Sequence, residues 1–321
     1  MIWGDGNRMY TGEAASVVRD LKQQQENQRW QVNPYGPWMF DFYRVVAGAQ
    51  GTMGIVTWAA LKCQVRRTIH DLYFVAAETF ESMQNFVYRA MHFRFPDELF
   101  VLNNADMAAL LGNNEKEVRE WKKRLPKWTV LVGVGGRELL PDQRAAARSK
   151  DLAETAQLCG LALTSTLAGI NGRTVVDLID KPSDHGYWKD QYKGSSQDIF
   201  FVTKLDETKK FIEKIHLMAD EMGYPVSDIG TYIQPLHIGS SYHCEFTLPY
   251  DPESDAEKAL AEKMYKEVSL EFAKMGAYYS RPYEIWSSMQ LNKDAVSYDA
   301  LNKLKDIFDP NKIMNPGKLI V

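Results

Sequence analysis

The chain has 321 residues, of which 45% are hydrophobic, 12% aromatic and 25% charged, and its formal net charge is −4. These fractions are typical of a folded globular protein and exclude a disordered or collagen-like chain. With 38 basic and 42 acidic residues, the charge balance gives no electrostatic reason to expect binding to nucleic acid or to an anionic membrane. At roughly 100–200 residues per domain, the length predicts about two domains.

Cysteine usage and hydropathy bear on the cellular location. No stretch approaches the ~18 uninterrupted apolar residues of a membrane helix, and the first residues lack the basic and apolar regions of a signal peptide. Cys63, Cys159 and Cys244 are scattered and contain no CxxC pair. They indicate free thiols in a reducing compartment and cannot ligate an iron–sulfur cluster. We therefore expect a soluble, cytoplasmic protein.

Turn signals dominate the first 57 residues. Residues 2–10 read as an apolar strand, an Asp-Gly turn and a second strand, which predicts a hairpin. Three glycines, Gly48, Gly51 and Gly54, then lead into a β-branched segment. Glycines at this density let the backbone approach a ligand closely. Their spacing alone favours a tight turn over a ligand-binding loop.

Strand and helix patterns alternate from about residue 68 onward. Strands are predicted near 72–76, 98–103, 128–134, 198–202, 230–235 and 243–248, and helices near 79–92, 141–159, 206–222 and 253–275. Two β-α-β-β-α units of this kind indicate an α+β fold, in which one antiparallel sheet carries helices on one face. The glycine run at 132–137 lacks a complete G-x-G-x-x-G motif, so we interpret it as a strand end and turn.

Two segments together resemble paired signatures of a known superfamily. These are Gln50–Thr57, which reads QGTMGIVT, and Phe308–Leu319, which reads FDPNKIMNPGKL. They are similar to signatures of the FAD-linked oxidase superfamily, of the vanillyl-alcohol oxidase and 4-cresol dehydrogenase type. The alternating units resemble its cap domain, in which an antiparallel sheet is flanked by helices in ferredoxin-like repeats. The resemblance implies the C-terminal part of an FAD-binding domain at 1–66, a substrate-binding cap domain at 67–277 and a return segment to the FAD-binding domain at 278–321.

Two branches of the superfamily compete. Three segments are similar to motifs of the phenol-oxidising branch: Asn33–Trp38, Met53–Thr57 and Gly230–Tyr232. Gly276–Arg281 is similar to its Gly-x-Tyr-Arg motif, although Ser280 separates the tyrosine from the arginine. The hydroxy-acid branch has a metal-binding His-x-Gly-Asp-Gly-Asn-x-His motif, but residues 237–243 read HIGSSYH and lack the aspartate. We therefore expect no metal, prefer the phenol-oxidising branch, and keep a 2-hydroxy-acid dehydrogenase of the lactate or glycolate type as the alternative.

The resemblance implies FAD as the cofactor and hydride transfer to flavin N5 from a phenolic or aromatic alcohol or an alkylphenol. Because Asp198 occupies the position where a histidine can carry covalent flavin, we expect FAD to bind non-covalently. Arg281 would hold a phenolate or carboxylate. The implied cofactor-binding residues are Gly51, Thr52, Gly54, Ile55, Val56, Asn315 and Lys318. The other implied residues are Tyr279 and Thr231, with Arg281, for catalysis, and Phe200, Tyr278 and His237 for substrate binding.

A complete member of this superfamily also has an N-terminal lobe that binds the FAD pyrophosphate, and this sequence does not contain one. We expect a second polypeptide to supply that lobe, so that this chain is one subunit of a split, heteromeric enzyme. A truncated chain and a fold that no longer binds FAD are the alternatives. Electrons would leave through oxygen or through an electron-transfer subunit. A non-catalytic cap or scaffold subunit is a third reading of the function.

Overall fold

The computed structural model describes residues 1–11, 22, 26, 43–59, 61, 63, 65–137, 139–181, 186–291 and 293–319. The chain divides into two compact units: unit 1 comprises Met1–Gln64 and Arg281–Val321, and unit 2 comprises Val65–Ser280. Unit 2 is therefore an insertion within unit 1. Among the described helices, none is long and apolar enough to cross a membrane. The motif at Asn33–Trp38 lies outside the described residues.

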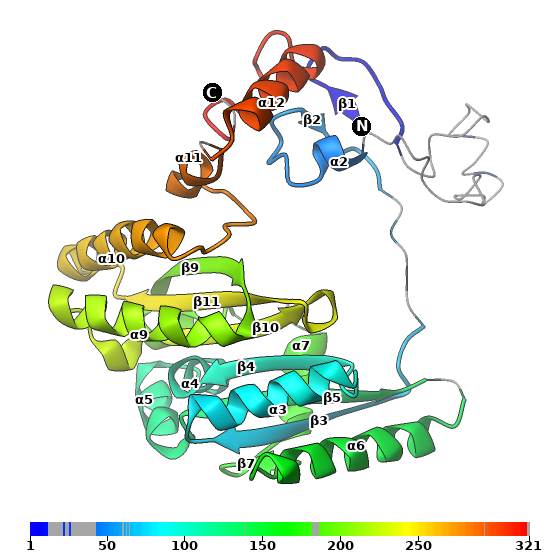
Figure 1. Cartoon of the computed structure of the whole chain (residues 1–321), viewed down its shortest axis with the longest axis vertical. Helices are drawn as coiled ribbons and strands as arrows, with labels where there is room; N and C mark the ends of the chain where they lie inside the picture. Colours follow the sequence, from blue (N-terminus) through cyan, green and yellow to red (C-terminus); the bar gives the residue numbers. More distant parts are fainter. Residues whose placement is uncertain are drawn as a thin grey trace. The chain divides into compact units, whose positions relative to one another are not determined.

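Unit 2 is built on a seven-stranded sheet with the order β6-β3-β5-β4-β10-β11-β9 (Figure 1). Each pair of neighbouring strands is antiparallel. The strands are β3 (Ile69–Ala77), β4 (Glu98–Asn103), β5 (Trp128–Gly136), β6 (Leu163–Thr164), β9 (Ser195–Thr203), β10 (Gly230–Leu236) and β11 (Ser241–Tyr250). A separate short pair is formed by β7 (Thr166–Leu167) and β8 (Ile170–Asn171). The α+β fold with one antiparallel sheet is confirmed.

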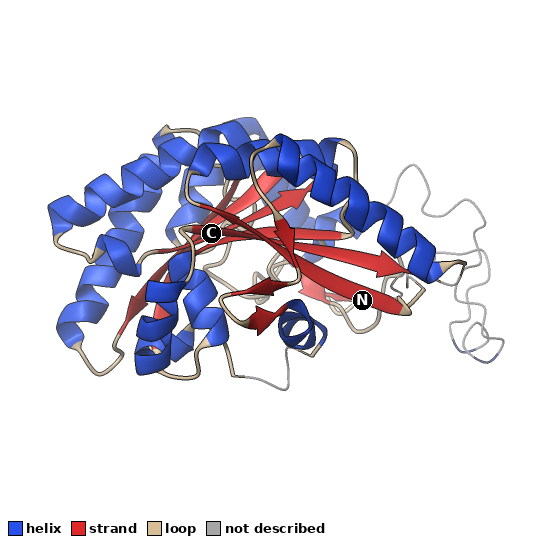
Figure 2. Cartoon of the chain, turned by 90° about the horizontal axis from the view of Figure 1, so that it is seen from below, coloured by secondary structure: helices blue, strands red, loops and turns tan. Residues whose placement is uncertain are grey.

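Helices cover both faces of this sheet (Figure 2). One face, called the α10 face below, packs against α3 (Phe80–His92), α6 (Pro141–Leu158), α9 (Leu205–Met222) and α10 (Asp255–Lys274). The other, called the α7 face, packs against α4 (Asn104–Leu111), α5 (Glu115–Arg124), α7 (Gly172–Asp180) and α8 (Asp190–Lys193). Two single-turn 3-10 helices, η3 (Val226–Asp228) and η4 (His237–Gly239), flank β10. The expectation of helices on one face alone was wrong, because short helices inserted between the strands cover the second face.

Successive strand side chains point alternately to the two faces of the sheet, so each face has its own hydrophobic core. Phe201 of β9 packs against Phe211 of α9 and Phe272 of α10, with ring centroids 4.6 and 5.3 Å apart. Leu72 and Phe74 of β3 belong instead to a buried cluster with residues of α4, α5 and α7. Because successive strand residues point to opposite faces, the strand register decides which residues can form a site together.

Unit 1 is assembled from both ends of the chain. It contains β1 (Ile2–Trp3), α2 (Tyr43–Val46), β2 (Gly54–Ile55), α11 (Ile285–Leu291) and α12 (Ala295–Phe308). β1 pairs with β2 in antiparallel register, and a bridge between Ile2 and Arg8 closes the predicted N-terminal hairpin. The Trp3 ring stacks on Phe308 with centroids 4.0 Å apart. The glycine segment and the C-terminal helix therefore share one small core.

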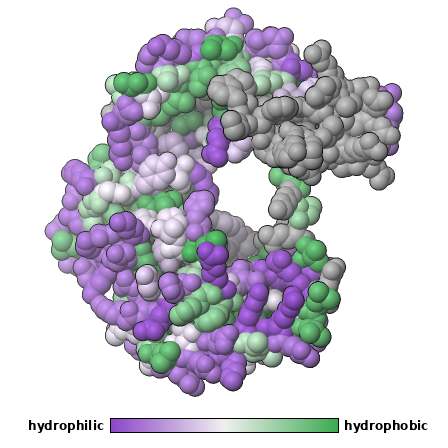
Figure 3. Space-filling model, turned by 45° about the vertical axis from the view of Figure 1, so that its right-hand side comes forward, coloured by the Kyte–Doolittle hydropathy of each residue, from purple (hydrophilic) through white to green (hydrophobic). Residues whose placement is uncertain are grey.

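Exposed apolar residues occur throughout the described parts of the chain. Leu61, Leu158 and Val296 are 83%, 75% and 79% exposed, respectively. On the face that Figure 3 shows, hydrophobic side chains lie scattered among hydrophilic ones. Scattered apolar residues are normal on a protein surface, so this pattern identifies no docking site.

Candidate functional site

In unit 1, Gln50 connects the glycine segment to two later segments of the chain. Its side-chain amide donates to the carbonyl of Pro282 at 3.0 Å, and its own carbonyl accepts from the Asn315 amide at 2.6 Å. Gln50 and Gly51 both have left-handed backbone conformations, with φ of 52° and 72°. This turn places the predicted Gly51 and Asn315 together, next to the segment that begins with Arg281. We call this arrangement the loop–coil clasp.

A buried ion pair fixes the clasp. The Lys305 ammonium donates to the carbonyl of Thr52, to the Asp309 carboxylate and, at 3.0 Å, to the carbonyl of Met314. Asp309 also accepts from the amides of Ile313 at 3.1 Å and Met314 at 2.9 Å. Burial opposes ionisation of Asp309, but the hydrogen bonds from Lys305 and these amides lower its pKa below the usual range. Lys305 and Asp309 therefore hold the glycine loop against the C-terminal coil.

The other predicted cofactor residues have different surroundings. Thr52 is fully buried, and its hydroxyl donates to the carbonyl of Ala49 at 2.7 Å, so its side chain is used inside the turn. A Cβ on Gly54 would lie 2.4 Å from the carbonyl oxygen of Ile2, so glycine is required where β1 and β2 pair. Ile55 and Val56 are more than half exposed. Lys318 is exposed on the coil.

In unit 2, three rows of residues cross β9, β11 and β10 on the α7 face. The register aligns Asp198 with Thr247 and Gly230, then Phe200 with Glu245 and Tyr232, then Val202 with His243 and Gln234. The first row lies beside the buried Asp106, and the last row ends at the exposed Gln234. Lys189, which immediately precedes α8, reaches into this face. We call Lys189, Asp198, Phe200, Tyr232, His243 and Glu245 the His243 cluster.

The centre of the His243 cluster is a buried charge network. The ammonium of Lys189, which is 4% exposed, bonds to Asp198 at 2.7 Å and also to Glu245. The other carboxylate oxygen of Glu245 lies 2.8 Å from Nε2 of His243. Burial would raise the pKa of Glu245, but the hydrogen bond with His243 and the charge of Lys189 lower it to about 2. Glu245 is therefore an anion at every physiological pH.

Aromatic rings flank His243. The rings of Phe200 and Tyr232 each lie with their centroids 5.8 Å from that of His243. Tyr278 forms a bridge with Val202 at the edge of β9. Since paired residues of antiparallel strands share a face, Tyr278 lies on the α7 face, in the row of His243, and is 57% exposed.

The strand register places Thr231 and Phe200 on opposite faces of the sheet, although both were predicted for one site. Thr231 pairs with Phe246, so it lies on the α10 face and cannot line one cavity with Phe200. Tyr279 is also buried on the α10 face side, where its ring approaches Phe201 and its hydroxyl donates to the carbonyl of Ser269 at 2.8 Å. Burial raises the pKa of this hydroxyl. Both side chains are packed within the core of unit 2, and Thr231 lies on the face opposite to Phe200; their catalytic roles stay predictions.

His237 lies at the tip of the β10–β11 hairpin rather than on the sheet. It is exposed, and the backbone of His237, Ile238 and Gly239 is left-handed, with φ of 44°, 64° and 81°. A β-branched residue such as Ile238 rarely adopts this conformation. His237 is therefore held by a strained turn, apart from the three rows.

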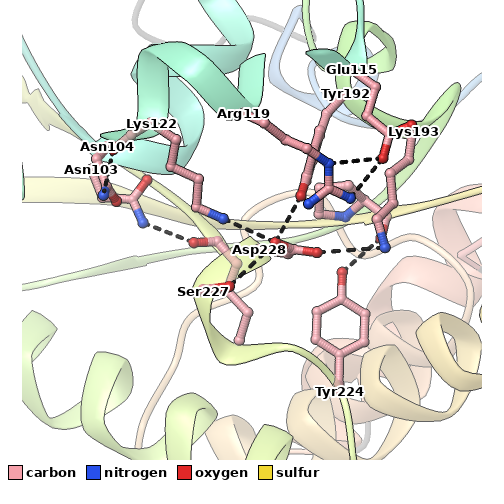
Figure 4. Close-up of polar contacts among 12 residues, drawn as sticks. Asn103, Asn104, Glu115, Arg119, Lys122, Tyr192, Lys193, Tyr224, Ser227 and Asp228 are labelled. Atoms are coloured by element: carbon pink, nitrogen blue, oxygen red, sulfur yellow. Dashed lines mark hydrogen bonds and ion pairs between the residues drawn. The ribbon is translucent and has the colours of Figure 1, made fainter. Parts of the chain in front are cut away.

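A polar cavity of about 650 Å³ lies between α5, α8 and η3 (Figure 4). Its centre is Asp228, which accepts from Lys122 and from the Tyr192 hydroxyl, each at 2.9 Å, and pairs with Lys193 at 3.5 Å. Burial opposes ionisation of Asp228, but these partners lower its pKa. Because the buried charge is already satisfied from three sides, we interpret this cluster as the anchor of α5 and α8.

Sequence reasoning missed Gln50, Lys305, Lys189 and Glu245. A lysine in an amphipathic helix reads as a surface residue, so Lys305 gave no signal. Lys189 lies in a segment without periodicity. Glu245 could have been found, since the predicted strand at 243–248 alternates His243 and Glu245 with apolar residues, and this alternation places both on one face.

The chain was compared with known protein families, sequences and structures. No curated protein sequence matches the chain. Residues 204–319 match the family of FAD linked oxidases, C-terminal domain. p-Cresol methylhydroxylase with substrate bound is similar in structure, with a TM-score of 0.71, 14% identity, and coverage of 99% of this chain and 64% of that chain. 4-Ethylphenol oxidase from Gulosibacter chungangensis, in an isoeugenol complex, is similar with a TM-score of 0.69 and 14% identity. The match covers 100% of this chain and 64% of that chain. Alkyldihydroxyacetonephosphate synthase is similar with a TM-score of 0.56 and 13% identity, and the match covers 88% of this chain and 51% of that chain.

These likenesses show the fold, and the chain spans 64% of the length of the first two structures. The chain shares its fold with p-cresol methylhydroxylase and 4-ethylphenol oxidase. The predicted resemblance to the FAD-linked oxidase superfamily is supported by the family match at 204–319 and by this fold.

Proposed function

We propose that this chain is the flavin- and substrate-binding subunit of an FAD-dependent oxidoreductase that dehydrogenates a small phenolic or aromatic alcohol or an alkylphenol. The loop–coil clasp carries the proposal. Its backbone turn at Gln50–Gly51 is fixed from beneath by Lys305, and the neighbouring Ile55 and Val56 expose apolar side chains suited to the face of a planar ring. FAD bound there would accept a hydride from the substrate.

The residues of the clasp fit the flavin end of FAD. The Asn315 amide holds the Gln50 carbonyl, which keeps the loop open beside the coil. Lys318 is exposed on the same coil, where a cation would stabilise negative charge on the reduced ring. Arg281, next to the Gln50-bonded Pro282, would hold a phenolate or carboxylate with its planar fork of donors.

The α7 face of unit 2 supports an aromatic substrate. Phe200 and Tyr232 place two rings beside His243, and Tyr278 lies on the same face through its bridge with Val202. Aromatic rings favour one another in stacked or edge-to-face contacts. The phenol-oxidising enzymes of similar fold favour the same substrate class.

The proposal includes a second polypeptide that holds the FAD pyrophosphate, as the resemblance to the FAD-linked oxidases implies. FAD would be bound non-covalently, since Asp198 is engaged by Lys189. The three cysteines are unpaired, which is consistent with a cytoplasmic location.

The test is purification from the native host by mild affinity capture, followed by a visible spectrum and masses of the co-purifying chains. A flavin spectrum that bleaches anaerobically with vanillyl alcohol or 4-ethylphenol supports the proposal. Bleaching with lactate or glycolate alone would reassign the substrate to the 2-hydroxy acids. A colourless preparation that takes up no added FAD would contradict the assignment and leave the scaffold role.

A further inference from the structure

Gln50 adopts a backbone conformation that is unusual for a glutamine. Its φ is 52°, in the left-handed region where a side chain costs free energy and where glycine or asparagine is more common. Backbone strain of this kind persists only where the surrounding contacts enforce it, and it is concentrated at functional sites. The contacts that hold Gln50 in this conformation therefore indicate its role.

Gln50 uses both its side chain and its carbonyl inside unit 1, to which all of its partners belong. The side-chain amide donates to the Pro282 carbonyl at 3.0 Å, and the backbone carbonyl accepts from the Asn315 amide at 2.6 Å. A Cβ on Gly51 would lie 3.7 Å from that same Asn315 nitrogen, so the loop and the coil are in close contact here. Gln50 therefore joins the glycine loop to the C-terminal coil and to the segment that begins with Arg281.

The backbone at Arg281 is restricted on its C-terminal side. Pro282 has a φ fixed by its ring, and the ring disfavours helical conformations of the residue before it. The Arg281 carbonyl accepts from the Tyr283 amide at 2.8 Å, which closes a three-residue turn centred on Pro282. The Tyr283 carbonyl accepts in turn from the amide of Trp286, which is 1% exposed in α11. The turn has little conformational freedom, and the Gln50 side chain connects it to the glycine loop.

We propose that Gln50 is a positioning residue, which fixes Arg281 relative to the glycine loop for the binding of a phenol. This inference rests on the proposed function, in which Arg281 holds the phenolate and the loop holds the flavin. Because the Gln50 amide is engaged by the Pro282 carbonyl, Gln50 acts through Arg281 and not on the substrate itself. The position of such an anchor matters, since a misplacement of about 1 Å can lower a rate by about 10²-fold.

A role in the turn alone is the weaker interpretation of Gln50. A turn that needed only this backbone would be formed with less strain by glycine or asparagine. Asparagine is one methylene shorter than glutamine, so it would leave the Pro282 carbonyl without this donor. The reach of the glutamine side chain to Pro282 therefore explains why a strained residue suits this position.

The experiment compares the flavin-loaded wild type, with any chain that co-purifies, with two variants. Gln50→Met keeps the length of the side chain but has no donor, and Gln50→Asn keeps an amide that is too short. Phenol, which has no benzylic C–H bond to oxidise, is titrated and followed by perturbation of the flavin spectrum. We expect both variants to bind phenol about 3–10-fold more weakly, as the loss of one hydrogen bond implies. The affinity for FAD should change less than about threefold.

Two further measurements separate positioning from general destabilisation. In anaerobic reduction by vanillyl alcohol, the rate at saturating substrate should fall about 10–100-fold in both variants. In the flavin-free full chain, hydrogen exchange at residues 283–291 should be faster in both variants than in the wild type. Exchange at residues 295–308 should be unchanged, because Lys305 holds that helix independently of the Gln50 side chain.

Gln157→Met is the matched control, since Gln157 is an exposed glutamine on α6, and it should behave as the wild type in every measurement. Wild-type phenol affinity in Gln50→Met or Gln50→Asn would overturn the assignment. A loss of FAD affinity equal to the loss of phenol affinity would also overturn it, because Gln50 would then serve the loop alone. If Gln50→Met does not fold, Gln50→Asn decides.

The wild type separates this assignment from the proposed function. If it takes up no FAD, or if phenol does not perturb its flavin spectrum, the proposed function fails and the assigned role in phenol binding fails with it. If the wild type responds to phenol and hydrogen exchange at residues 283–291 is the same in all proteins, the proposed function stands and the positioning role of Gln50 is overturned.

Discussion

At the scale of single residues, two buried ionisable side chains differ in how their charge is compensated: Lys305 in the loop–coil clasp and Asp106 beside the His243 cluster. Lys305 is satisfied by one carboxylate and two carbonyl oxygens, so its charge is fully used. Asp106 is 2% exposed, and its carboxylate accepts a long hydrogen bond of 3.5 Å from the Thr247 hydroxyl. A compensated buried charge binds elements together, whereas a poorly compensated one tends to become neutral.

Removal of Lys305 should disrupt the loop–coil clasp. In Lys305→Met the Asp309 carboxylate stays buried without its cation, and breaking one side of a buried pair typically costs about 3–5 kcal/mol. We expect the calorimetric transition of unit 1 to move to lower temperature and the coil at 309–319 to become sensitive to protease. Lys303→Met is the control, because the Lys303–Asp299 pair on the same helix is exposed. A normal unit 1 transition in Lys305→Met would contradict the assigned role.

Asp106 should make the stability of unit 2 depend on pH. Burial raises its pKa to about 8, opposed by the charge of Lys189 and reinforced by Glu245 and Asp198. In the unfolded chain the same group ionises near pH 3.9. Between about pH 4 and 8 the folded state therefore binds more protons, so the free energy of unfolding falls as pH rises.

Asp106→Asn should remove this fall, so that the variant gains stability over the wild type as pH increases from 4 to 8. Urea unfolding at a series of pH values measures the effect. The exposed Asp220→Asn on α9 should keep the wild-type pH dependence. Parallel pH curves for the wild type and Asp106→Asn would show that Asp106 is ionised in the folded protein.

At the scale of elements, the docking of α7 onto β3 depends on a close backbone approach. Gly172 is the first residue of α7, and a Cβ there would lie 1.9 Å from the carbonyl oxygen of Leu72. Gly172→Ala should therefore destabilise unit 2 by about 1–3 kcal/mol, the usual cost of overpacking. Thr174→Ala, exposed on the same helix, should stay within about 0.5 kcal/mol of the wild type in urea unfolding. Equal stability of both variants would show that α7 shifts without cost.

Elements with strong periodicity were predictable from the sequence. The expected helices near 79–92 and 206–222 correspond to α3 and α9, and the left-handed Gly223 follows the end of α9. The helix α5 was missed because Val118 is its single buried residue, so no apolar stripe marks it. Contacts between distant segments, such as Gln50 with Pro282, leave no local pattern and required the structure.

The candidate site was predictable to a similar degree. The paired signatures indicated the glycine loop and Asn315, which the structure joins through Gln50. The choice between Tyr278 and Tyr279 depends on strand register, because a shift of one residue moves a side chain to the opposite face. The bridge between Val202 and Tyr278 fixes that register, and the sequence alone does not contain it.

At the scale of the whole molecule, the two units differ in how they depend on chain continuity. Unit 2 is one uninterrupted segment with its own two-sided core. A fragment of residues 65–280 should therefore fold alone and unfold cooperatively, as measured by circular dichroism with urea. A fragment of residues 1–64 should not fold, since Trp3 packs against Phe308 from the other end of the chain. A disordered 65–280 fragment would show that unit 2 needs unit 1.

The composition of unit 1 also has a consequence for biosynthesis. The carbonyl of Thr52 receives its bond from Lys305, which follows it by 253 residues. At a synthesis rate of about 5–20 residues per second, on the order of 10–50 s pass between translation of Thr52 and translation of Lys305. Unit 2 emerges during that interval and can fold first, because all of its strands pair within the segment already made. The clasp is then completed only when residues 305–315 have been translated, so any ligand held there binds after unit 2 has been made.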